Sequence, residues 1–208
     1  MAWRTLLERE TVDSPYRMAA YAPYLCFPDL RMRTWIALLR GINVGRTRSL
    51  PMKELTALIQ QLGGTDVRTY IQSGNAVFRH EDARNLAAAL SGAIERVHGF
   101  APDIQMFDVE HLHAVVAANP FTEADVAPAA LHVFFLARPA PAPDLAALER
   151  LRRDTERFLL TEQALYLHTP EGFGKSKLAE RVENALGVPA TARNWRTVST
   201  LLEMAAAA

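Results

Sequence analysis

The sequence predicts an α+β protein made of two similar units that follow one another along the chain. Three observations favour this fold class. The chain has 208 residues, half of them hydrophobic, which is enough for two small cores that share an interface. Short apolar runs of strand length alternate with segments whose apolar residues recur at helical spacing. Glycine and proline separate these segments at regular intervals.

The first unit is predicted to span residues 32–108. Its strands are indicated by apolar, β-rich runs at Arg33–Leu39, Val67–Gln72, Asn75–Phe78 and Asp103–Phe107. Pro51 is suited to the first turn of a helix that Gly63-Gly64 ends. Asp82 is suited to cap a second helix, whose inward residues would be Leu86, Leu90, Ile94 and Val97. The resulting order β-α-β-β-α-β is the split βαβ pattern of a ferredoxin-like unit, or α/β plait.

The second unit is predicted to span residues 109–208 as a looser version of the first. Strands are indicated at Leu131–Leu136 and Ala164–His168. Helices are indicated at Val109–Ala118, around Leu145, Leu148 and Leu151, near Ser176–Leu186 and near Asn194–Met204. Residues 1–31 differ from both units, because they carry three prolines and no sustained period. They are predicted to form a poorly ordered N-terminal extension.

Composition excludes several classes of function. Lys+Arg and Asp+Glu both number 23, so the chain is not a globally basic nucleic-acid binder. The single cysteine, Cys26, excludes an internal disulfide and a cysteine-based zinc site. No run approaches the roughly 18–20 apolar residues of a membrane span. We therefore expect a cytoplasmic protein that does not bind membranes.

The familiar enzyme motifs are absent from the sequence. Gly172–Ser176 (GFGKS) would need a glycine at the position of Thr169 to be a phosphate loop. Gly41–Gly45 (GINVG) lacks two glycines of a dinucleotide fingerprint. His111 and His113 would face different sides of a helix, so they cannot chelate one metal. We expect no metal and no cofactor, and the sequence leaves open whether any reaction is catalysed.

Four polar segments at element boundaries are the candidate site: Leu39–Gly45, Tyr70–Asn75, Gly172–Lys177 and Thr191–Arg196. If they converge, their cations, hydroxyls, amides and helix N-termini suit an anionic ligand in a cleft between the units. The predicted ligand-binding residues are four cations (Arg40, Lys175, Lys177, Arg193), five orienting groups (Asn43, Ser73, Asn75, Ser176, Asn194) and two walls (Tyr70, Trp195).

These segments resemble a bacterial family known as domain of unknown function 1697. The matching stretches are WIALLRGINVG, VRTYIQSGNAVF, ANPF, GFGKSKL and TARNWRTV, spread over residues 32–204. One departure is Arg46-Thr-Arg48, which stands where the family usually has a Gly/Lys-rich stretch. The resemblance implies two ferredoxin-like units and no particular reaction.

Other readings of the same residues stay open. Asn43 and Asn75 can bond the backbone of their own loops, and Trp195 can be a packing anchor. Single-stranded RNA binding would require Trp35, Tyr70 and Phe78 to point outward on an open sheet, and the zero net charge does not favour it. A protein-interaction module is the third alternative. Residues 101–208 carry ten basic and fourteen acidic groups, so they could meet a basic partner, and this reading predicts no pocket.

Overall fold

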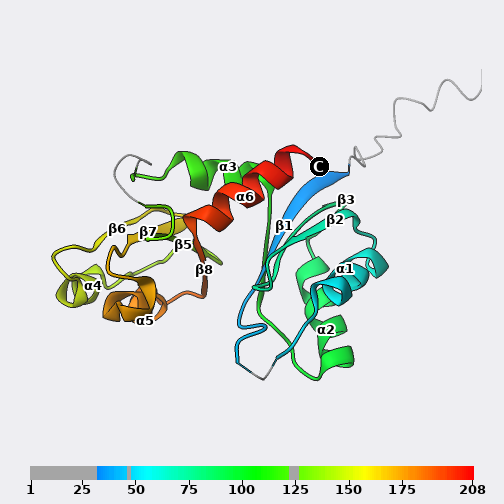
Figure 1. Ribbon diagram of the computed structural model, residues 1–208, viewed down its shortest axis with the longest axis horizontal. Coiled ribbons are helices and arrows are strands. Elements are labelled where there is room, and N and C mark those ends of the chain that lie inside the picture. The colour runs from blue at the N-terminus through cyan, green and yellow to red at the C-terminus, as the bar shows by residue number, and fades with distance from the viewer. Residues whose placement is uncertain (1–31, 46–47, 122–126) are drawn as a thin grey trace, which may run out of the picture. The chain divides into compact units, whose positions relative to one another are not determined.

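The computed structural model describes residues 32–45, 48–121 and 127–208, which carry two four-stranded antiparallel sheets and six α-helices (Figure 1). The first sheet has the order β2-β3-β1-β4. Its strands are β1 (Arg33–Leu39), β2 (Thr65–Tyr70), β3 (Asn75–His80) and β4 (Ile104–Asp108). Helix α1 (Met52–Gln61) connects β1 to β2, and α2 (Leu86–His98) connects β3 to β4.

The second sheet has the order β6-β7-β5-β8 and repeats the connectivity of the first. Its strands are β5 (Leu131–Leu136), β6 (Arg157–Leu160), β7 (Ala164–His168) and β8 (Ala190–Asn194). Helix α4 (Leu145–Leu151) follows β5, and a short 3₁₀ turn, η1 (Phe173–Lys175), leads into α5 (Lys177–Leu186). Two further helices flank this sheet in sequence: α3 (Val109–Ala117) precedes β5 and α6 (Trp195–Ala206) follows β8.

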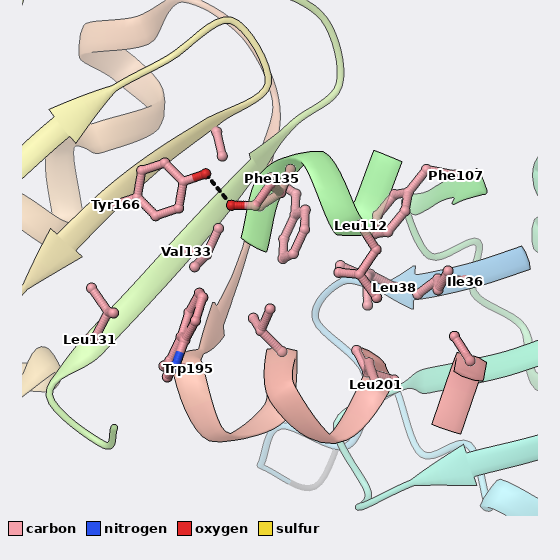
Figure 2. Close-up of a cluster of buried hydrophobic side chains, with 14 of the residues drawn as sticks. Ile36, Leu38, Phe107, Leu112, Leu131, Val133, Phe135, Tyr166, Trp195 and Leu201 are labelled. Atoms are coloured by element: carbon pink, nitrogen blue, oxygen red, sulfur yellow. Dashed lines mark hydrogen bonds between the residues drawn. The ribbon is translucent and has the colours of Figure 1, made fainter. Parts of the chain in front are cut away.

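Three hydrophobic clusters cover both faces of each sheet. Helices α1 and α2 pack on one face of the first sheet, and α4 and α5 pack on one face of the second. The other face of each sheet contributes to a shared cluster with α3 and α6 (Figure 2). In that cluster the hydroxyl of Tyr166 donates to the carbonyl of Val115 at 2.5 Å. Met32–Ala208 thereby form one compact unit.

This burial explains why β1 reads as a continuous apolar run. Ile36 and Leu38 face the shared cluster, whereas Ala37 and Leu39 face α1 and α2. A strand buried on both faces loses the polar alternation of a half-exposed strand. The structure is thus a mixed α/β fold consistent with the predicted pair of α+β units. The predicted boundary at residue 108 stays a prediction, and the predicted extension 1–31 lies outside the described residues.

The aromatic residues that RNA binding would need do not form an open platform. Phe78 is fully buried against α1 and α2. Trp35 packs against the same cluster and donates its indole N–H to the carbonyl of His80 at 3.1 Å. Tyr70 is half-buried.

Some elements differ from the predictions. Helix α2 begins at Leu86 rather than after Asp82, because the Asp82 carboxylate accepts hydrogen bonds from Arg84 instead of capping the helix. Val97 is 62% exposed rather than inward, and His98, four residues after buried Ile94, is the half-buried residue of the last turn. Strands β6 and β8 were not predicted.

Candidate functional site

Three of the four predicted segments meet around Arg193 of β8. Its Nε donates to Asn75 Oδ1 at 2.5 Å, and its Nη2 donates to the carbonyls of Leu39 at 2.7 Å and Ser73 at 3.1 Å. Its Nη1 donates to the carbonyl of Ala192 at 2.8 Å. Burial lowers the pKa of Arg193 to about 10, so the guanidinium stays charged at neutral pH. We call this group of contacts the Arg193 junction.

Two asparagines hold the loops next to the Arg193 junction. Asn75 is fully buried, and its Nδ2 donates to the Tyr70 carbonyl and to Ser73 Oγ. Asn43 donates to the carbonyls of Leu50 and Gln72 and accepts from the Leu50 N–H. Their amides therefore bond the loops, as the structural reading of these residues expects.

Arg40 lies directly after β1 and forms a bidentate ion pair with Glu183 of α5. The two N···O distances are 2.6 Å and 2.5 Å, and the Arg40 side chain is 42% exposed. Glu183 also accepts from the N–H of Ala190 at 2.8 Å. This carboxylate therefore ties the end of β1 to the start of β8.

The remaining predicted residues lie at helix starts. Ser176 is buried and caps α5 by accepting from the Ala179 N–H, whereas Lys175 and Lys177 are exposed. Within the described residues, no hydrogen bond or ion pair joins these three to the Arg193 junction. Asn194 caps α6 by accepting from the Thr197 N–H. Trp195 is buried in the shared cluster, where a packing anchor is expected to lie.

A cavity of about 510 Å³ lies between the edge strands β4 and β8. Residues of the first sheet and of α2 form one wall, and residues around β8 form the other. The lining includes Trp35, Arg40, Arg84 and residues 103–106 on one side, and Ala137 and Pro189–Thr191 on the other. The structure describes all eleven predicted ligand-binding residues, and Arg40 is the one among them that lines this cavity.

The charged groups of the cavity lining are the guanidinium groups of Arg40 and Arg84 and the carboxylate of Asp103. Arg84 has a side chain 85% exposed and pairs with Asp82 through Nε and Nη2. The side-chain hydrogen bond from Arg84 lowers the pKa of Asp82 to about 2. A guanidinium has five N–H donors, so the bonds that Arg40 and Arg84 make here leave donors on both. Gln105 adds an amide whose Oε1 is buried and has no partner in the part of the chain that the structure describes.

Buried histidines are the other polar groups of interest. The ring of His132 stacks on Phe173 at a centroid distance of 3.9 Å, and burial lowers its pKa to about 4. Burial also lowers the pKa values of His111 and His168.

No group of three or more His, Cys, Asp or Glu side chains among the described residues could hold a metal ion. None of the helices described there is long and apolar enough to cross a membrane.

The family model for a protein of unknown function, DUF1697, matches residues 32–166. The chain belongs to the DUF1697 family. This confirms the resemblance drawn from the motifs. Among solved structures, this DUF1697 chain is similar to the conserved bacterial protein SP0830 from Streptococcus pneumoniae, at 22% identity and a TM-score of 0.64. The similarity covers 84% of this chain and 99% of that one, and at this identity it shows the fold alone. No curated protein matches the chain.

Several cavity residues of this DUF1697 chain carry no signal of their own in the sequence. Arg84 and Gln105 lie outside the four polar segments, and neither belongs to a recognisable motif. The sequence suggests for Trp35 only a role in stacking on RNA, whereas the structure places it in the cavity lining. The one usable signal was the excess positive charge of residues 32–100, nine basic against five acidic groups, which contain both cavity arginines.

Proposed function

We propose that this protein binds an anionic small molecule, bearing a carboxylate or a phosphate, in the cavity between β4 and β8. The observation that carries the proposal is that Arg40 and Arg84 both line this cavity of about 510 Å³. Small-molecule sites are typically concave, roughly 300–1,000 Å³ in volume, and mostly apolar with a few polar groups. Ile104 and Met106 supply apolar walls here.

We also propose that both sheets belong to ferredoxin-like units and that the protein acts in the cytoplasm. The repeated order β-α-β-β-α-β and the strand orders β2-β3-β1-β4 and β6-β7-β5-β8 support the first statement. The presence of one cysteine in 208 residues supports the second.

An anion in this cavity would share the guanidinium groups with protein carboxylates. Arg40 keeps its bond to Glu183 and Arg84 keeps its bond to Asp82, because each has further N–H groups to donate. A hydrogen bond to a charged group contributes about 1.5–3 kcal/mol. The neighbouring carboxylates repel the ligand, so the expected affinity is moderate and falls with added salt.

The test is a titration of the full ¹⁵N-labelled chain with inorganic phosphate and with butyrate, followed by amide chemical shifts. We expect shifts at residues 104–106 and at Ala190 and Thr191. Arg84→Ala should weaken binding at least fivefold. Among the described residues its ion pair is with Asp82 alone, two residues away, so its loss should spare the fold. Lys177→Ala is the matched control, because Lys177 is an exposed cation away from the cavity lining.

The location of the shifts decides the outcome. Shifts that gather at residues 175–177 and vanish in Lys177→Ala would move the anion site to the start of α5. Titrations that shift no amide of the cavity would refute the proposed function.

A further inference from the structure

The wall of the cavity formed by β4 is the open edge of a sheet. In the part of the chain that the structure describes, β4 pairs only with β1, so its other side has no neighbouring strand there. Residues 103–106 line the cavity along this side. Main-chain groups on an open strand edge can pair with another extended chain.

The hydrogen-bond register identifies which main-chain groups face the cavity. The N–H of Arg40 donates to the carbonyl of Asp103, and the register pairs Leu39 with Ile104 and Leu38 with Gln105. In an antiparallel ladder the bonded pairs alternate, so Asp103, Gln105 and Phe107 bond to β1. The main-chain groups of Ile104 and Met106 therefore point away from β1, toward the cavity side. The bond from Leu39 N–H to the Gly74 carbonyl, on the opposite edge of β1, fits the same alternation.

The facing strand β8 differs, because side chains already bond two of its outward main-chain groups. The N–H of Ala190 donates to Glu183, and the carbonyl of Ala192 accepts from Arg193. No hydrogen bond of Ile104 N–H or Met106 N–H is found within the described residues. The β4 edge thus presents two consecutive outward N–H groups to a ligand, whereas the N–H of Ala190 on β8 is already bonded to Glu183.

We infer that the ligand of this cavity is the free C-terminal end of a peptide, which adds to β4 as an antiparallel strand. The inference rests on the proposed function, namely that the cavity binds an anion. A strand antiparallel to β4 ends at the start of β4, beside Asp103. Arg40 lies there, because it bonds Asp103 through its main chain, and Arg40 lines the cavity.

Each part of the peptide then has a defined partner. The terminal carboxylate meets the Arg40 guanidinium, while the main chain pairs with Ile104 and Met106. Strand addition of this kind draws affinity from main-chain bonds and selectivity from alternate side chains. With a rise of about 3.4 Å per residue, three peptide residues span the two outward positions of β4.

The probe is acetyl-trialanine with a free carboxylate, compared with its C-terminal amide, with a version N-methylated at each alanine, and with butyrate. The assay is the same amide titration of the full chain. Acetyl-trialanine should bind at least tenfold more tightly than butyrate and should shift the amides of Ile104 and Met106 downfield. The C-terminal amide and the N-methylated peptide should each lose most of this advantage.

A proline at position 106 tests the edge from the side of the protein. Met106→Pro removes an N–H that points away from β1, so the ladder with β1 is kept, and edge strands tolerate such prolines. It should abolish the ratio by which acetyl-trialanine binds more tightly than butyrate. Met106→Ala, the matched control, removes the same apolar side chain from the cavity wall but keeps the N–H, so it should keep this ratio whatever its effect on butyrate alone. If Met106→Pro does not fold, the N-methylated peptide makes the same comparison from the ligand.

The outcomes separate this inference from the proposed function. Butyrate shifts at the cavity with no tighter binding of acetyl-trialanine would overturn the peptide inference and leave anion binding standing. Equal binding of the acid and the C-terminal amide would also overturn it, because the placement of the terminus at Arg40 would be wrong. If neither phosphate, butyrate nor the peptide shifts any amide of the cavity, both the peptide inference and the proposed function are overturned.

Discussion

Arg193→Met is expected to destabilise the protein by about 3 kcal/mol. The substitution keeps a long apolar stem but removes the donors of the Arg193 junction. Two acceptors with short bonds then lose a partner: Oδ1 of the fully buried Asn75 and the carbonyl of Leu39, at 2.5 Å and 2.7 Å. Each buried acceptor left without a partner costs about 1–3 kcal/mol. Relief of the guanidinium's desolvation offsets part of the total.

The assay is urea unfolding, with thermal unfolding as a second measure. For a chain of this size, about 3 kcal/mol corresponds to a fall in Tm of roughly 6–12 °C. Arg193→Lys should fall between the parent and Arg193→Met, since an ammonium keeps the charge but not the planar set of donors. Arg196→Met is the matched control on exposed surface, expected within about 0.5 kcal/mol of the parent. A change below 1 kcal/mol in Arg193→Met would refute the structural role of the junction.

Three further predictions concern other parts of the structure. Gly74→Ala should cost about 3 kcal/mol in urea unfolding, because its φ is +77° and a Cβ there would lie 2.7 Å from Leu39 Cβ. Gly99→Ala, at φ +75° with open space around it, should cost only about 1 kcal/mol, and equal costs would contradict the steric argument. Burial lowers the pKa of His132 from 6.5 to about 4, so the unfolded chain takes up a proton first as the pH falls. Stability should therefore decrease between pH 6.5 and 4, by up to about 3 kcal/mol from this group, and a His132→Phe variant that keeps the whole slope would show this assignment to be wrong. Glu183→Gln removes a negative charge beside Arg40 and should strengthen butyrate binding severalfold in the amide titration, whereas unchanged or weaker binding would argue against Arg40 as the anion's partner.

The elements that the sequence predicted well are those with strong burial. β1, β5 and β7 lie inside their sheets, so their apolar runs stand out from the surrounding polar segments. β6 was missed because it is an edge strand, with Arg157 and Leu159 exposed. β8 was missed because its sequence, ATARN, has small and polar residues that serve the Arg193 junction and the cap of α6.

The site was only partly predictable for a related reason. Polar residues at the ends of strands indicate where segments gather, and three of the four segments do gather at the Arg193 junction. Whether Asn75 points to a ligand or to a neighbouring loop depends on strand register, which the sequence does not define. The cavity residues Arg84 and Gln105 had no signal of their own, because the cavity arises where the edges of two sheets come near each other.

Hydrogen bonds and an ion pair link the polar segments to the walls of the cavity, although Arg40 is the only predicted ligand-binding residue that belongs to both. Arg193 bonds β8 to the last carbonyl of β1, and Glu183 joins Arg40, just after β1, to Ala190 of β8. β4 is bonded to β1, so these contacts set the distance between the two edges that face the cavity. A loss of ligand binding in Arg193→Met would therefore report displaced walls. A loss in Arg84→Ala, whose exposed side chain pairs with nearby Asp82 alone within the described residues, would report a missing contact to the ligand. The two variants together distinguish residues that build the site from residues that bind in it.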